Sequence, residues 1–275
     1  MNTRVGQGLA AGLLVAIAGA AALVVRDTLG AIASVPAMSL MEQWQQAALE
    51  AEAAAVAVAE EAATDSPPTL DTIAPLATVT YTPSENDWQL ARSSLDNALQ
   101  LAPDNPELHA NLGRLYQFRF ENNNLPLDTI SESAGHAAAA FQRAAQLRPT
   151  WPYHWWDVAR TEYVLQRAPG PAFRQALDNV VRFGPWLEDV QLFATDLALE
   201  HWPALDASSH QLALQNIDRA LQRNPDIVSA MLASYAAWSE VCSSGERQDA
   251  ALDHLRDYCQ SPELRAGISA PPPAG

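Results

Sequence analysis

Apolar and small side chains recur along this chain at steps of three and four residues, the spacing that places them on one face of an α-helix. In the segment 37–63 that face consists of Leu40, Trp44, Ala47, Ala51, Ala55, Val58 and Ala62. We expect a long alanine-rich helix here, interpreted as a spacer in preference to a stalk that self-associates as a weak coiled coil. The same spacing recurs between residues 85 and 260, so the pattern as a whole predicts an all-α fold.

The segments after residue 85 repeat one pattern of small or apolar positions followed by a proline. Its four copies are Ala91, Leu95, Ala98, Pro103; Ala137, Phe141, Ala144, Pro149; Phe173, Leu177, Val180, Pro185; and Ala213, Ile217, Ala220, Pro225. The first three positions share a helix face, and proline cannot continue the hydrogen-bond ladder of a helix. Each copy therefore predicts a helix that ends near its proline, and a second helix follows.

The stretch ALQLAPDNPELHANLGRLY resembles the joint between consecutive tetratricopeptide (TPR) repeats. A later joint aligns with it, where His109 matches Trp155 and Gly113 matches Ala159. The resemblance covers roughly residues 85–260 and implies a TPR-like helical-hairpin solenoid, in which stacked neighbours share a continuous core. The chain departs from the family in extra residues within 119–135 and in Glu162, which stands at an aromatic position.

The run GLAAGLLVAIAGAAALVV, residues 8–25, is uncharged and lies between Arg4 and Arg26. A bilayer core requires about 20 apolar residues, so the run predicts a retained transmembrane helix. This reading is favoured over a cleaved signal peptide or a buried helix. From Asp27 to Ala91 there are ten acidic residues and no basic ones. Because positive residues stay on the cytoplasmic side, we expect a single-pass protein of the inner (cytoplasmic) membrane with most of the chain in the periplasm.

Proline-rich and Thr/Ser-rich stretches set the expected domain boundaries. The membrane anchor takes residues 1–36, the alanine-rich helix and Pro/Thr-rich linker take 37–84, and the TPR-like helical repeat domain takes 85–262. Residues 263–275, which include SAPPPAG, are expected to be a disordered tail.

The net charge is −16, from 32 acidic residues and 16 basic ones, all of them arginine. This balance argues against a nucleic-acid partner, whose phosphates require basic neutralisation, and against adhesion to an anionic lipid surface. Cys242 and Cys259 could pair if the domain lies outside the cytoplasm. The helix assignment opposes pairing, because it puts them at opposite ends of an antiparallel hairpin, roughly 20 Å apart.

The stretch LRPTWPYHWWDVAR, residues 147–160, concentrates aromatic side chains at a turn. Trp155 falls on the large-residue position of the repeat and is expected to pack against a neighbouring helix. The pattern does not require the other aromatics, and Trp186 follows the next turn. Exposed aromatics at such turns stack on sugars or anchor protein partners. The candidate binding residues are Trp151, Tyr153, Trp156 and Trp186.

The sequence contains no recognisable catalytic, metal-binding or nucleotide-binding motif. The six histidines form no metal-binding spacing, and no GxSxG, P-loop or GxGxxG motif occurs. We therefore expect no enzymatic activity, no bound metal and no cofactor.

The overall plan, an amino-terminal anchor followed by a linker and TPR-like helices with an aromatic joint, resembles VpsP-type accessory proteins of bacterial exopolysaccharide biosynthesis. That resemblance implies an adaptor that supports polysaccharide assembly or export through protein–protein contacts within an envelope complex. One alternative is a carbohydrate-binding module that uses the turn aromatics. Another is a periplasmic TPR factor for cytochrome maturation or pili.

Overall fold

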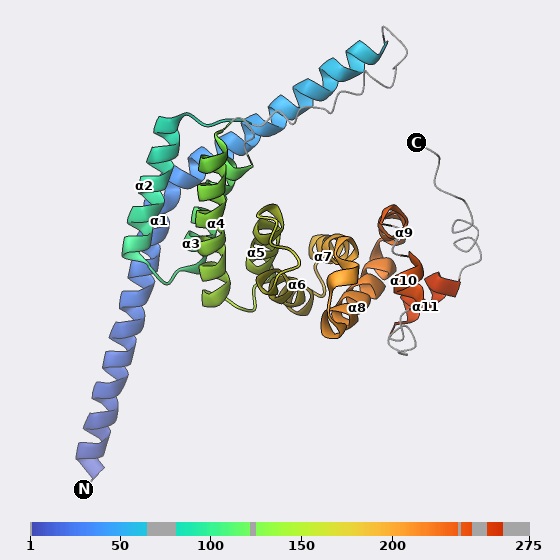
Figure 1. Cartoon of the computed structure of the whole chain (residues 1–275). Helices are drawn as coiled ribbons and strands as arrows, with labels where there is room; N and C mark the ends of the chain where they lie inside the picture. Colours follow the sequence, from blue (N-terminus) through green and yellow to red (C-terminus); the bar gives the residue numbers. More distant parts are fainter. Residues whose placement is uncertain (1, 65–80, 122–124, 236–237, 244–251, 261–275) are drawn as a thin grey trace. The chain divides into compact units, whose positions relative to one another are not determined.

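The structure, a computed structural model, describes residues 2–64, 81–121, 125–235, 238–243 and 252–260 (Figure 1). Its elements are α1 (Asn2–Thr64), α2 (Glu85–Leu101), α3 (Pro106–Phe120), α4 (Leu127–Leu147), α5 (Pro152–Val164), α6 (Pro171–Phe183), α7 (Glu188–Glu200), the short 3-10 helix η2 (Trp202–Ala204), α8 (Ala207–Arg223), α9 (Pro225–Ser234), α10 (Trp238–Ser243) and α11 (Asp253–Gln260). No strand occurs in these ranges, which confirms the all-α expectation. Most of the expected Pro/Thr-rich linker and the whole tail lie outside the described residues.

The helices fold into two compact units, Met1–Leu147 (unit 1) and Arg148–Gly275 (unit 2). Unit 1 holds α1 to α4, and unit 2 holds α5 to α11. The boundary between the units falls directly after α4, at the second proline joint of the repeated pattern.

The four prolines of the sequence pattern mark helix ends as expected. The helices α2, α4, α6 and α8 each end two residues before one of them. After the first three prolines the next helix begins three residues later, at α3, α5 and α7. Pro225 differs because it is itself the first residue of α9. Proline is tolerated at that position because the first amide of a helix has no intrahelical acceptor.

The first three proline joints share one further feature, a side-chain hydrogen bond that closes the turn. A side-chain N–H at the start of the following helix donates to the carbonyl oxygen of the proline six residues earlier. The pairs, with their N···O distances, are His109 and Pro103 at 2.8 Å, Trp155 and Pro149 at 2.7 Å, and Gln191 and Pro185 at 2.6 Å. Three different residue types thus supply an equivalent N–H donor at the same position of the repeated pattern.

Polar side chains cap the amino-terminal ends of several helices by accepting their free amides, as such residues commonly do. Asn105 Oδ1 accepts the amides of Glu107 and Leu108 at the start of α3. At the start of α8, the backbone amide of Ser209 and the hydroxyl of Ser208 donate to Asp206. These hydrogen bonds stabilise the charged carboxylate and lower the pKa of Asp206 to about 2.

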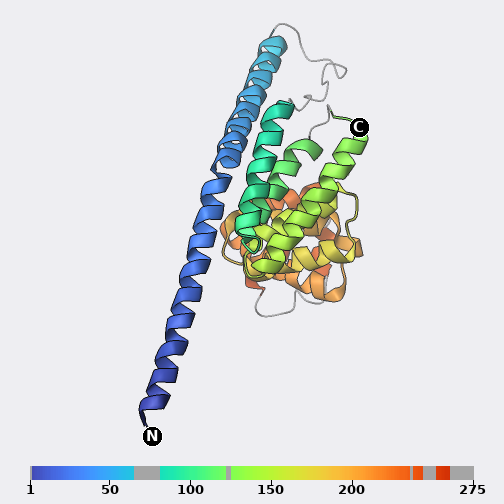
Figure 2. The same cartoon turned by 90° about the vertical axis from the view of Figure 1, so that its left-hand side faces the viewer.

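Unit 1 is built on α1, which packs lengthwise against α2 and also contacts α3 (Figures 1 and 2). The middle of α1 supplies fully packed side chains: Ala37 is buried, and the Trp44 ring is 2% exposed and meets Phe118 edge-on. Ser94 of α2 donates to the carbonyl oxygen of Ala33 at 2.6 Å. Residues 30–44 therefore belong to the packed unit, a role that the spacer interpretation of 37–63 did not include.

Small side chains explain why α1 and α2 pack so closely. A Cβ atom added to Gly30 would lie 2.8 Å from Cβ of Ala102, which is closer than van der Waals contact allows. Side-chain periodicity alone did not reveal this face, because an alanine-rich helix carries small side chains on its exposed faces as well as on its packed one. The helix also continues through Pro36, where the sequence placed the boundary between anchor and spacer.

The pair α3 and α4 completes unit 1 and shows the same close approach. A Cβ atom at Gly113 of α3 would lie 2.5 Å from the ring of Phe141 in α4. The ring is 1% exposed, so it fills the space that the glycine leaves. Gly135, also in α4, has no atom within 4 Å of an added Cβ and faces solvent.

The part of α1 that precedes its contacts with α2 is apolar. Within the described residues, the stretch Ala16–Ala51 is long and apolar enough to cross a membrane by length and composition. Its carboxyl-terminal half overlaps the residues that pack in unit 1. The segment of α1 that leads up to Val25 projects beyond the other helices of unit 1 (Figures 1 and 2).

Unit 2 pairs α5 with α6 and α7 with α8, and α8 also contacts α6, α9 and α11. A buried polar bridge joins α7 to α8: the amide nitrogen of Asn216 donates to the Gln191 carbonyl oxygen at 2.8 Å and to the Thr195 hydroxyl at 3.0 Å. Side chains from all these helices form the core, including Phe173, Leu177, Val190, Leu214, Ile217 and Leu255.

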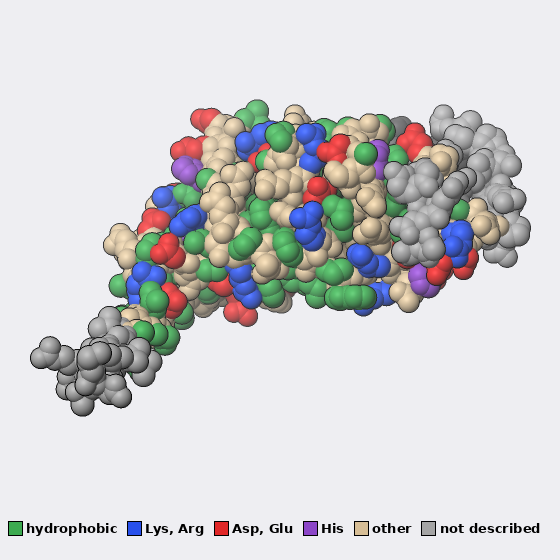
Figure 3. Space-filling model, turned by 90° about the horizontal axis from the view of Figure 1, so that it is seen from below, with side chains coloured by type: hydrophobic (Ala, Val, Ile, Leu, Met, Phe, Trp, Pro, Cys, Tyr) green, Lys and Arg blue, Asp and Glu red, His purple; other side chains and the backbone are tan. Residues whose placement is uncertain are grey.

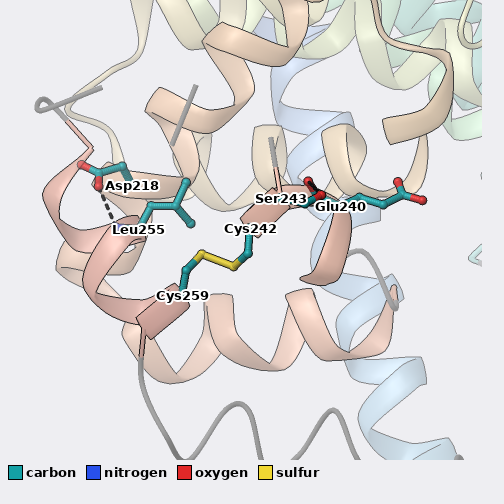
Figure 4. Close-up of a disulfide and its surroundings, with 6 residues drawn as sticks. All are labelled: Asp218, Glu240, Cys242, Ser243, Leu255 and Cys259. Carbon is teal, nitrogen blue, oxygen red and sulfur yellow. Dashed lines mark hydrogen bonds between the residues drawn. A yellow bond between two sulfur atoms is a disulfide. The ribbon is translucent and has the colours of Figure 1, made fainter. Parts of the chain in front are cut away.

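Cys242 of α10 and Cys259 of α11 form a disulfide, with their Cα atoms 5.6 Å apart (Figure 4). The sequence argument against pairing was therefore wrong. It assumed one continuous helix up to Cys242, whereas α9 ends at Ser234 and the separate short helix α10 begins at Trp238. That interruption removes the antiparallel hairpin that would have kept the two cysteines a helix length apart.

Candidate functional site: an aromatic surface of unit 2

The amino-terminal end of α5 places three of the four candidate aromatics side by side. Trp151 is the residue before the helix, and Pro152 opens it. The ring centroids of Trp151 and Tyr153 lie 5.5 Å apart, and those of Tyr153 and Trp156 lie 6.1 Å apart. The guanidinium of Arg148 lies 4.2 Å from the centroid of the Trp151 ring, within cation–π range.

The row continues onto α7 through Phe193. The rings of Trp156 and Phe193 are parallel, with centroids 4.0 Å apart. We call Trp151, Tyr153, Trp156 and Phe193 the aromatic row; all four are half-buried, so each keeps part of its surface in contact with solvent. The sequence pattern did not single out Phe193, because it lies in an amphipathic helix with no aromatic neighbour to draw attention to it.

A polar contact fixes the middle of the aromatic row. The Tyr153 hydroxyl donates to Asp189 at the start of α7, with an O···O distance of 3.0 Å to Oδ2. Burial and the hydrogen bond to the Asp189 carboxylate raise the pKa of Tyr153. The row therefore presents aromatic surface together with an acidic group.

Trp186 lies at the turn before α7 and is 72% exposed. Its backbone carbonyl accepts a hydrogen bond from Arg223 at 2.6 Å, which holds the turn. Among the described residues its ring stacks on no other aromatic ring. Trp186 therefore does not belong to the aromatic row, although it is only three residues from Asp189 in sequence.

Trp155 contributes to the proline joint before α5. Its indole N–H donates to the Pro149 carbonyl oxygen in the joint described above. The ring is half-buried on α5. The aromatics of 151–156 thus divide into one that closes a turn and three that contribute to the aromatic row.

Unit 1 contains a second aromatic cluster, formed by Trp88, Tyr116 and His136. Tyr116 stacks on His136 with centroids 4.8 Å apart, and the Arg119 guanidinium lies 3.7 Å from the centroid of the Trp88 ring. Trp88 and Tyr116 are buried, and burial raises the pKa of Tyr116. This cluster therefore packs α2, α3 and α4 together and offers little aromatic surface to a partner.

A hollow of about 340 Å³ lies at the carboxyl-terminal ends of α5 and α7, lined by Tyr163, Val164, Gln166, Ala168 and His201. The Tyr163 hydroxyl donates to Glu200, and this hydrogen bond raises the pKa of Tyr163. Nε2 of His201 is buried and has no hydrogen-bond partner among the described residues. No motif in the sequence drew attention to these residues.

A metal ion would need several His, Cys, Asp or Glu side chains around one point. No three such side chains converge in the part of the chain that the structure describes.

No protein-family model matches this chain, and no curated protein matches its sequence.

Proposed function

We propose that this chain is a membrane-anchored adaptor of TPR-like helical repeats that lies in the periplasm and supports exopolysaccharide assembly or export. The aromatic row is the surface that binds a protein partner. Half-buried Trp and Tyr side chains beside an arginine have the composition of binding hot spots. The single observation that carries the proposal is the continuity of this row, from Arg148 over Trp151 to Phe193 of a second helix.

The repeat interpretation is supported by the hydrogen bond that closes three successive proline joints. A solenoid repeats one supersecondary unit, and equivalent positions should then make equivalent contacts. His109, Trp155 and Gln191 do so although their side chains differ chemically. The pairing of α3 with α4, α5 with α6 and α7 with α8 is the pairing that a TPR-like array requires.

The periplasmic location is supported by the apolar run 8–25 and by the disulfide between Cys242 and Cys259. Disulfides persist in oxidising compartments and are rare in the cytosol. Fusions of alkaline phosphatase and of green fluorescent protein to the carboxyl terminus test the location. We expect active phosphatase and a dark fluorescent fusion; the reverse pattern would place the units in the cytosol and overturn this part of the proposal.

The role in exopolysaccharide assembly rests on the resemblance of the overall plan to VpsP-type accessory proteins, and in-cell photocrosslinking tests it. A photoreactive phenylalanine at Trp156 should give adducts with a glycosyltransferase, a polymerase or an export channel. The matched control places the same residue at Ile227, which is exposed on α9 of the same unit. Absence of adducts at Trp156, or identical adducts at both positions, would rule out the row as the partner surface.

A second candidate function is direct carbohydrate binding through Trp151, Tyr153 and Trp186. It is favoured by the neighbouring Asp189, because sugar sites combine aromatic faces with a hydrogen-bonding carboxylate. Titration of the full chain with the host polysaccharide, followed by tryptophan fluorescence, distinguishes the two functions. A saturable change that Trp151→Ala abolishes would favour the carbohydrate module, and an unchanged signal would favour the adaptor.

A further inference from the structure

The apolar run of α1 leads without interruption into the packed part of unit 1. The run ends at Val25, and Gly30 is already in close contact with Ala102 at the carboxyl-terminal end of α2. Both residues belong to one helix, so no flexible segment separates the apolar run from unit 1. The end of unit 1 that carries the α2–α3 turn is therefore the end from which the apolar part of α1 projects (Figures 1 and 2).

The distance between the apolar run and this turn matches the thickness of a lipid headgroup layer. Gly30 follows Val25 by five residue steps along the helix, which is about 7.5 Å at 1.5 Å per residue. The hydrocarbon core of a bilayer is about 30 Å thick within a total of about 40–45 Å, which leaves about 5–8 Å for each headgroup layer. A turn at the level of residues 26–30 then lies among the headgroups, and a tilt of about 20°, typical of membrane helices, changes this height little.

The charges at the turn fit such a position. Arg26 of α1 lies 3.8 Å from Asp104 in the turn, and Arg143 near the end of α4 lies 3.1 Å from the same carboxylate. The two guanidinium groups neutralise the carboxylate, and both side chains remain partly exposed, so they can also reach lipid phosphates. Arginine at the end of a membrane helix is a common interfacial anchor.

Exposed apolar side chains lie near these charged residues in sequence. Leu101 is 41% exposed at the last residue of α2, Pro103 is exposed in the turn, and Leu29 is exposed on α1. Figure 3 views the chain from below Figure 1, and hydrophobic, basic and acidic side chains are mixed on the face that it shows. The net charge of −16 opposes adsorption to anionic lipid, so α1, and not electrostatic attraction, holds this surface at the membrane.

We infer that the α2–α3 turn, residues 101–106, together with Arg26 and Arg143, is a surface that contacts lipid headgroups and seats unit 1 directly on the bilayer. This inference rests on the proposed function in one respect, the retention of α1 as a membrane anchor. It replaces the expected arrangement, in which a spacer and a linker hold the folded domain away from the membrane, with direct contact.

Fluorescence quenching by headgroup spin labels tests the inference on the full chain in phosphatidylcholine vesicles. A single cysteine replaces Leu101 or Leu90 and carries a nitrobenzoxadiazole label; the native cysteines form a disulfide and do not react. The two leucines are exposed on the same helix and eleven residues apart. They therefore lie on nearly the same face, about 16 Å apart along the axis.

We expect spin-labelled headgroups to quench the label of Leu101→Cys several-fold more strongly than that of Leu90→Cys. The difference should persist at high salt, because the helix and not charge attraction holds the turn in place. Equal quenching at both positions, in chains that stay in the vesicles through an alkaline wash, would overturn the headgroup contact alone. Loss of the chain in that wash would overturn the anchor and the headgroup contact together.

Discussion

The disulfide between α10 and α11 should hold the carboxyl-terminal end of unit 2 against α8. The bond joins residues 17 apart in sequence. Closing a loop of this length removes chain entropy worth roughly 3 kcal/mol at 25 °C. Leu255 of α11 is buried, and its amide donates to Asp218 of α8 at 2.8 Å, so this amide reports whether α11 is docked (Figure 4).

Replacing both cysteines by serine should therefore make the docked state of α11 less stable by roughly 3 kcal/mol. Every 1.4 kcal/mol is a tenfold change in an equilibrium, so the Leu255 amide should exchange with deuterium about 100-fold faster. Hydrogen–deuterium exchange with mass spectrometry on the full chain measures the rate. Amides in the middle of α8, which α6 and α7 also cover, should change much less.

Two controls make this test specific. Ser243→Ala removes a hydroxyl next to Cys242 that donates to the Glu240 carbonyl oxygen within α10, and it should leave the exchange of α11 unchanged. Maleimide should label the native chain after reduction and not before it. If the double serine variant exchanges at the native rate, then buried contacts such as Leu255 hold α11 without help from the disulfide, and the entropic reasoning fails.

Three further predictions concern packing and capping. Gly113→Ala should destabilise unit 1 by about 1–3 kcal/mol through overpacking against the buried phenylalanine ring of α4, whereas Gly135→Ala should stabilise it by up to about 1 kcal/mol; urea unfolding of the detergent-solubilised chain measures both. Trp44→Ala should lower the free energy of unfolding by about 3–5 kcal/mol in the same assay. Leu49→Ala, at an exposed site, should leave it almost unchanged. Equal effects of the two substitutions would show that this part of α1 is a spacer and not part of the packed unit. The lowered pKa of Asp206 means that its cap stabilises the fold above the usual carboxyl pKa and is lost as the pH falls through about 2, so Asp206→Asn should remove this acid dependence from thermal unfolding curves.

The positions of most helices could be predicted from the sequence, because proline has a strong local effect. A helix ends two residues before Pro103, Pro149, Pro185 and Pro225. The ring of proline and its missing N–H are enough to predict this, without any knowledge of tertiary contacts.

The parts that could not be predicted depend on contacts between distant residues. Nothing in an alanine-rich helix distinguishes residues 30–44, which pack against α2, from exposed residues further along α1. The disulfide depends on the interruption between α9 and α10, and no proline or glycine marks that point. Phe193 joins the aromatic row because α7 lies beside α5, a tertiary arrangement that the spacing of residues within α7 does not encode.

The absence of any joint between the apolar run and the packed part of α1 has a mechanical consequence for an anchored chain. A membrane helix adjusts to bilayers of different thickness by tilting. In the proposed anchored arrangement, a tilt cannot be absorbed between Val25 and Gly30, so unit 1 would rotate with it. Lipid composition would then set the angle at which unit 1 faces other proteins of the same membrane.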